Sequence, residues 1–225
     1  MTLILCYRFG SGIMLLGDTG FQVGGNGPPQ MRRGARKVYR NANRQIALAG
    51  WGDLALPFQG TYCQPERWLE EFVRIRLQTE TSADQAVASL ERELRLPNYP
   101  RGSNGGLFVA GFLLYRPVLY EVTISPAASG PPNLEVQIQC IPSDDLSAAP
   151  LIRGSGYQLW DRFTQDFGTP TPQNHREFVR VFANAVRTLQ ARGAVLSLPI
   201  QGVFIEPRYP EVELELEGSI APQVR

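Results

Sequence analysis

The first twenty residues, MTLILCYRFGSGIMLLGDTG (1–20), decide the fold of this chain. Residues 2–9 are rich in apolar and β-favouring side chains, which predict a strand. The Gly-Ser-Gly triplet at 10–12 is a strong signal for a hairpin turn. Residues 13–17 form a near-continuous apolar run, which is typical of a strand buried on both faces, and Asp18 ends it. The chain therefore opens with a predicted hairpin of two strands.

Thr2 carries the chemistry that this stretch suggests. Removal of Met1 would leave Thr2 with a free α-amino group, and Asp18 follows sixteen residues later. A threonine with its own amine can serve as nucleophile and base together, so no separate histidine is required. The chain has one histidine, His175, which we expect to be exposed on the surface and not catalytic. Thr2 is therefore the candidate nucleophile.

The composition favours a soluble, cytoplasmic protein. The chain has 225 residues, 43% of them apolar, and a net charge of +1, so it can bury a sizeable core and shows no charge excess that would indicate nucleic acid. Cys6, Cys63 and Cys140 are odd in number and far apart, which favours free thiols over a metal site. We expect no signal peptide, no membrane-spanning helix and no cofactor.

The rest of the chain alternates blocks of strands with pairs of helices. We expect strands at 36–40, 45–49, 106–115, 118–125, 135–140, 201–206 and 211–217. We expect helices at 66–78, at 82–94 with Ser82 and Gln85 as a capping box, within 151–167, and from Thr171-Pro172 to about residue 192. Residues 19–33, 96–104 and 142–150 predict loops, and 51–62 fits no single pattern. This order predicts stacked layers in one domain, residues 1–217, followed by a tail at 218–225.

Four features occur in a meaningful order: Thr2, Asp18, the Lys37-Val38 pair and the Ala49-Gly50 pair. This pattern resembles the proteasome β-subunit family of N-terminal-nucleophile hydrolases, in its bacterial homologue branch. Members of that family begin with Thr and carry an Asp sixteen residues on. A Lys followed by Val or Ile opens their next strand, and Ala-Gly ends the strand after it. Asp53 and the Gly-Ser-Gly triplet at 154–156 also match, so the resemblance is dense over residues 2–53 and collinear to about residue 206.

The resemblance implies an α+β fold, a four-layer αββα sandwich with two antiparallel sheets between helix pairs. It implies a threonine-type peptidase that hydrolyses peptide bonds through an acyl-enzyme ester on Thr2. Lys37 would favour the alkoxide of Thr2 by its charge, and Asp18 would hold Lys37. The amide of Gly50 would face the oxyanion, and Ser155 would assist near the amine. The resemblance also implies a peptide or unfolded-protein substrate, a homo-oligomeric ring and an unfoldase partner of unknown identity, with no nucleic acid or membrane.

Each site residue also has an ordinary structural interpretation. Thr2 can simply begin a strand, Asp18 and Gly50 can be turn residues, Lys37 one of several surface cations, and Ser155 a helix N-cap.

The chain also departs from the family pattern. Thr19-Gly20 follow Asp18 where a polar residue and Arg are usual, and Ala194 stands where an Asp supports the amine. Two alternatives therefore remain, a catalytically inactive ring subunit and a small-molecule amidase.

Overall fold

The computed structural model describes most of the chain, in several ranges. These are residues 3–10, 12–23, 30–32, 34, 36–43, 45–53, 56–58, 61–63, 65–94, 104–126, 134–142, 144–194, 196, 198–207 and 212–216. Thr2, the glycine-rich centre of the predicted loop at 24–29 and the predicted tail at 218–225 lie outside the described residues.

The opening hairpin is confirmed and forms the middle of the first sheet. The strands of this sheet follow the order β12-β1-β2-β13-β14, and neighbours are antiparallel. Their bounds are β1 Ile4–Phe9, β2 Gly12–Asp18, β12 Leu151–Arg153, β13 Ile200–Ile205 and β14 Val212–Leu216. Ile4 pairs with Gly17 and Phe9 with Gly12, and Gly10 has a φ of 56°, which suits a glycine in a tight turn.

The second sheet has the order β11-β10-β9-β6-β5 and is also antiparallel. Its strands are β5 Val38–Arg40, β6 Ala47–Asp53, β9 Asn104–Leu113, β10 Arg116–Pro126 and β11 Leu134–Ile141. The predicted strand at 45–49 therefore continues to Asp53, because β6 pairs with β9 as far as Asn104. Gly52 has a φ of 88°, and a Cβ there would lie 2.4 Å from the Asn104 carbonyl oxygen, so only glycine fits.

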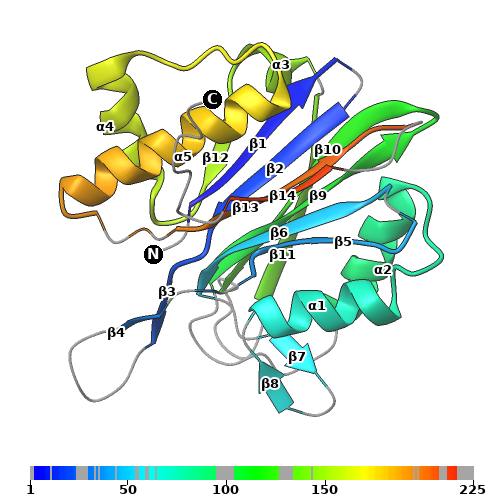
Figure 1. The fold of residues 1–225 in the computed structure, drawn as a ribbon. Helices are drawn as coiled ribbons and strands as arrows, with labels where there is room; N and C mark the ends of the chain where they lie inside the picture. Colours follow the sequence, from blue (N-terminus) through cyan, green and yellow to red (C-terminus); the bar gives the residue numbers. More distant parts are fainter. Residues whose placement is uncertain are drawn as a thin grey trace.

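Two helices cover the outer face of each sheet, which gives the predicted four-layer αββα arrangement (Figure 1). Helices α1 Pro65–Ile75 and α2 Ala83–Leu94 pack on the second sheet, and α4 Tyr157–Phe167 and α5 His175–Ala191 pack on the first. Leu5 and Leu16 face α5, whereas Cys6 and Leu15 face the second sheet. The apolar run in β2 is continuous because both of its faces are buried.

The capping box at α2 is confirmed, but the predicted start of α5 is wrong. Ser82 Oγ accepts from the Gln85 amide at 3.3 Å, and Gln85 Oε1 accepts from the Ser82 amide at 3.3 Å. Helix α5 begins at His175 and not at Thr171-Pro172. Its N-cap is Asn174, whose side chain accepts from the Glu177 amide at 2.9 Å and satisfies a donor of the first turn.

Several short strands and one short helix lie in segments that the sequence predicts as loops or for which it predicts no single structure. The 19–33 segment contains a hairpin of β3 Phe21–Val23 and β4 Gln30–Arg32, and 51–62 contains the pair β7 Leu56–Phe58 and β8 Thr61–Cys63. The 142–150 segment contains α3 Asp145–Ala148, and β12 precedes α4 within 151–167. Elements of three or four residues are too short to show a hydrophobic period, so pairing with a neighbour determines them.

Among the described helices, none combines the length and apolar character that a membrane crossing requires.

The core on the first sheet provides a stability test. Phe182 on α5 is fully buried, whereas Phe167 at the end of α4 is 58% exposed. We expect Phe182→Ala to lower the free energy of unfolding by about 3–5 kcal/mol, because it removes a buried ring and leaves a cavity. Phe167→Ala is the matched control and should change it by less than about 1 kcal/mol. Urea titration of both variants measures the difference, and equal losses would contradict the packing described for α5.

Candidate functional site

Asp18 and Lys37 form a buried ion pair between the two sheets. Lys37 Nζ donates to Asp18 Oδ1 at 2.9 Å, and the side chains are 2% and 0% exposed. The same ammonium group donates to the carbonyl oxygen of Gly20. Lys37 is therefore not one of the surface cations, and the pairing that the sequence predicts for Asp18 is present.

Asp18 also joins the start of the chain to this ion pair. Its Oδ1 accepts from the Leu3 amide at 2.8 Å, and its own amide donates to the Leu3 carbonyl at 3.1 Å. The same oxygen atom thus accepts from Leu3 and from Lys37. Leu3 is the residue after Thr2, so the described chain begins beside the Lys37 ammonium group.

Two of the residues that depart from the family pattern, Thr19 and Gly20, are parts of this site. The amide of Gly20 donates to Asp18 Oδ2 at 3.0 Å, while its carbonyl accepts from Lys37. Thr19 is fully buried, and its hydroxyl donates to the Pro199 carbonyl at 2.7 Å. Backbone groups of Gly20 therefore complete the hydrogen bonding of the ion pair, a role that side-chain motifs cannot reveal.

Close packing and the neighbouring strand hold Lys37 in place. A Cβ at Gly17 would lie 2.9 Å from Ile4 Cδ1 and 3.3 Å from Val38 Cγ2. A side chain therefore does not fit at this position, where β2 passes the start of β5. The Lys37 amide donates to Gln201 Oε1 of β13 at 3.2 Å. Groups of the first sheet thus position a residue that precedes an edge strand of the second.

Gly50 lies inside β6 and not in a turn, and its amide already has a partner. The Gly50 N–H donates to the Lys37 carbonyl at 3.2 Å, a distance at the long end of the normal range. An oxyanion at this amide would have to share the proton with that carbonyl or displace it.

Ser155 lies at the end of the first sheet where β1 begins. It is exposed, sits between Gly154 with a φ of 99° and Gly156, and follows β12, whose Arg153 pairs with Ile4. The N-cap of α4 is Gly156, with no side-chain cap, so the interpretation of Ser155 as a helix N-cap is wrong.

A cavity of about 460 Å³ adjoins Ser155. It is lined by both sheets, through Arg153, Gly154 and Ser155 of the first and Trp51, Gly52, Asn104, Gly105, Glu121 and Thr123 of the second. Glu121 and Arg153 form a second ion pair across the sheets there, in which Arg153 Nη2 donates to Glu121 Oε2 at 2.8 Å and Nε donates to Oε1. No motif in the sequence indicates this pair, because its members are 32 residues apart.

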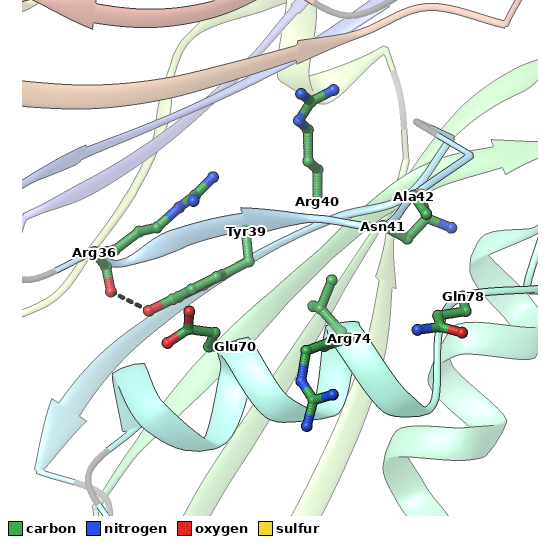
Figure 2. Close-up of a pocket in the computed structure, with 9 residues that line it drawn as sticks. Arg36, Tyr39, Arg40, Asn41, Ala42, Glu70, Arg74 and Gln78 are labelled. Carbon is green, nitrogen blue, oxygen red and sulfur yellow. Dashed lines mark hydrogen bonds between the residues drawn. The ribbon is translucent and has the colours of Figure 1, made fainter.

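A second cavity, also about 460 Å³, lies between β5 and α1 (Figure 2). Its lining includes Arg36, Arg40 and Arg74, but Figure 2 shows that Arg40 points away from α1 and that the guanidinium groups do not converge. The hydroxyl of Tyr39 donates to the Arg36 carbonyl at 2.8 Å. None of the described site residues, Asp18, Lys37, Gly50 and Ser155, lines this cavity.

His175 is partly buried, so the prediction of a surface histidine is wrong. Its ring stacks on Phe204 with centroids 4.3 Å apart, and within the described part of the chain its buried Nε2 has no hydrogen-bond partner. Burial lowers the pKa of His175, nearby Arg176 lowers it further, and Glu206 partly opposes them.

Cys6 and Cys140 are free thiols, and Cys6 is buried whereas Cys140 is exposed. Cys6 packs in the core, and this burial raises the pKa of its thiol, so the thiol is not reactive.

The Asp18–Lys37 pair makes a prediction about stability. Lys37→Met leaves the carboxylate of Asp18 buried without its cation, and we expect a loss of about 3–5 kcal/mol in unfolding free energy. The double variant Asp18→Asn/Lys37→Met should lose less than this single variant, because no unpaired charge remains. Arg74→Met, which breaks the exposed pair with Glu71, is the control and should cost at most about 1 kcal/mol. A double variant less stable than Lys37→Met would refute this account.

His175 makes a prediction about pH. Because its pKa is lowered in the folded protein, the unfolded chain binds a proton more readily, and stability is lost as pH falls through the unfolded value of about 6.5. The decrease in unfolding free energy from about pH 7.5 to pH 5 should therefore be smaller in His175→Phe than in the unchanged protein. Denaturant titrations at both pH values measure it, and identical decreases would show that His175 is not the titrating group.

Comparisons with known proteins bear on the fold. No protein-family model matches the chain, and no curated protein matches it. A solved structure, the Anbu (Gly-1) mutant from Hyphomicrobium sp. strain MC1, is similar with a TM-score of 0.58 and 13% sequence identity, over 97% of this chain and 88% of that chain. Anbu is a bacterial proteasome-like homologue of the N-terminal-nucleophile hydrolases. This chain therefore has the fold of a proteasome-like N-terminal-nucleophile hydrolase.

Proposed function

We propose that this chain is a proteasome-like threonine peptidase that hydrolyses peptide bonds through an acyl-enzyme on Thr2, after removal of Met1. One observation carries the proposal: Asp18 Oδ1 accepts from the Leu3 amide and from Lys37 Nζ. The residue that follows Thr2 is thereby bound to the carboxylate that holds the lysine. This arrangement supports a cation next to a nucleophile at the start of the chain.

The proposed reaction uses the α-amine and hydroxyl group of Thr2 and the positive charge of Lys37. An α-amine with a pKa of about 7.7–8.0 takes the hydroxyl proton of Thr2 near neutral pH, directly or through water. The positive charge of Lys37 favours the alkoxide, which attacks the peptide carbonyl. Collapse of the tetrahedral intermediate breaks the C–N bond and forms an ester on Thr2, and the α-ammonium group gives its proton to the leaving nitrogen, which departs as an amine. Water then hydrolyses the ester and restores the enzyme.

The strand register supports a role for Ser155. Ile4, which follows Thr2 by two residues in the sequence, pairs with Arg153, which precedes Ser155 by two residues. We propose that Ser155 assists proton transfer at the amine and that Gly50 donates to the oxyanion, in competition with the Lys37 carbonyl.

The proposal includes assembly. Anbu-like proteasome homologues form homo-oligomeric assemblies, and we propose a homo-oligomeric ring for this chain, closed by heterologous contacts. Each subunit would be one domain of residues 1–217 in the cytoplasm. Its substrates would be peptides or unfolded proteins, delivered by an unfoldase whose identity the proposal leaves open.

A second candidate function, a catalytically inactive ring subunit, also has a specific observation in its favour. The Gly50 amide is paired with the Lys37 carbonyl, so the oxyanion donor is occupied. Ala194 also lacks the carboxylate that would support the amine. Reactivity of Thr2 separates the two candidates.

Covalent labelling tests the proposed nucleophile. Intact mass should show that Met1 is absent, and a β-lactone should then add once, at Thr2. The adduct should be lost in Thr2→Ala and retained in Thr171→Ala, which changes an exposed threonine before α5. Labelling of Lys37→Met should be slower by about 10²-fold or more, because the cation that favours the alkoxide is gone. Retained Met1, or labelling that persists in Thr2→Ala, would refute the proposal.

A further inference from the structure

The start of β1 lies between two ion pairs that each join the two sheets. Ile4 pairs with Gly17, which precedes Asp18, and on its other side with Arg153. Asp18 binds Lys37 of the second sheet, and Arg153 binds Glu121 of the second sheet. The proposed site uses the first pair and Ser155 in the lining of the cavity, whereas the second pair and the rest of the cavity have no assigned role.

The space between the sheets opens to solvent beside the second pair. Successive side chains of β10 point to opposite faces, so Leu119, Glu121 and Thr123 share the face that lies toward the first sheet. Leu119 is fully buried and Glu121 is 7% exposed, whereas Thr123 is exposed. Burial on this face therefore decreases along β10, and the cavity of about 460 Å³ lies at its exposed end.

Trp51 forms the apolar wall of this cavity. A Cβ at Gly106 would lie 2.4 Å from Trp51 Cζ2, so the glycine allows the indole ring to lie against β9. The ring also contacts Phe108, with centroids 4.6 Å apart, and Trp51 is only 8% exposed. The wall is thus held in place before any ligand arrives, which is typical of a binding site.

Arg153 retains hydrogen-bond donors at the edge of the cavity. A guanidinium group has five N–H donors, and within the described residues Arg153 uses three of them, two on Glu121 and one on the Ile152 carbonyl. Its side chain is 35% exposed and lines the cavity. Both carboxylate oxygens of Glu121 accept from Arg153, and the Glu121 side chain is only 9% exposed, so the guanidinium group is the more accessible part of the pair.

We propose that this cavity binds a segment of a peptide substrate that carries a hydrogen-bond acceptor side chain, Asn, Gln, Asp or Glu, with Arg153 as the donor. The inference rests on the proposed function for its substrate class. It adds a specificity site that the nucleophile, Asp18 and Lys37 do not provide. An apolar side chain would leave the remaining Arg153 donors covered and unpaired, which disfavours it.

Peptide binding to the Thr2→Ala protein tests the site without catalysis. The probes are fluorescein-labelled octapeptides of alanine in which one Asn, or one Leu of similar size, is moved along the sequence. At one position we expect the Asn peptide to bind about tenfold more tightly than the Leu peptide in fluorescence anisotropy, the effect of one or two hydrogen bonds to a charged donor. Thr123→Trp, which fills the open end, should abolish this preference. The matched control Gln137→Trp should keep the preference for Asn. Gln137 is an exposed residue of β11 that pairs with Thr123 of β10, but it does not line the cavity.

A further variant keeps the test decisive if Thr123→Trp does not fold. Glu121→Gln/Arg153→Met removes both charges together and should also abolish the preference for Asn. Equal binding of Asn and Leu peptides, absence of peptide binding, or a preference that survives the altered cavity would overturn the inference. β-Lactone labelling of the protein with Thr2 intact reports the proposed function separately. Peptide preference without labelling would therefore refute the peptidase and keep the site, and labelling without preference would do the reverse.

Discussion

The ion pair between Lys37 and Asp18 is the interaction on which the rest of the site depends. Taking two charges out of water is costly, and here the cost is offset by direct contact and by additional hydrogen bonds from Leu3 and Gly20. These bonds join three separate parts of the chain, which are its start, the end of β2 and the approach to β5. Because one carboxylate serves all three, the position of the lysine and the position of the chain start are coupled.

The layered architecture explains why charges can meet here at all. Alternating side chains of β1 and β2 bury one face against α4 and α5 and the other against the second sheet, so the sheets close over an apolar layer that includes Cys6, Leu15 and Phe108. At the end of this layer the apolar side chains give way to two ion pairs, Asp18–Lys37 and Glu121–Arg153, and then to an open cavity. The proposed chemistry and the proposed specificity site therefore share one end of the sandwich.

Some parts of the site could be predicted because their signals are local or lie in a characteristic order. The opening hairpin, the Ser82–Gln85 capping box and the pairing of Asp18 with Lys37 belong to this group. Other parts act through backbone groups, such as the Gly20 carbonyl, or through partners distant in the chain, such as Glu121 and Arg153. The short strands β3, β4, β7, β8 and β12 and the start of α5 could not be predicted, because no hydrophobic period marks them.

By itself, the sequence predicted the fold class and the candidate nucleophile, because apolar alternation and residue order are properties of a linear chain, and its resemblance to the proteasome β-subunit family implied the pairing of Asp18 with Lys37. Only the tertiary structure decided that Lys37 is buried, that the Gly50 amide is already paired with the Lys37 carbonyl, and that Ser155 is not a helix cap. It also decided that His175 stacks on Phe204. The physical reason is that burial and hydrogen-bond partners depend on which surfaces come together when the layers pack, and local sequence does not encode that contact.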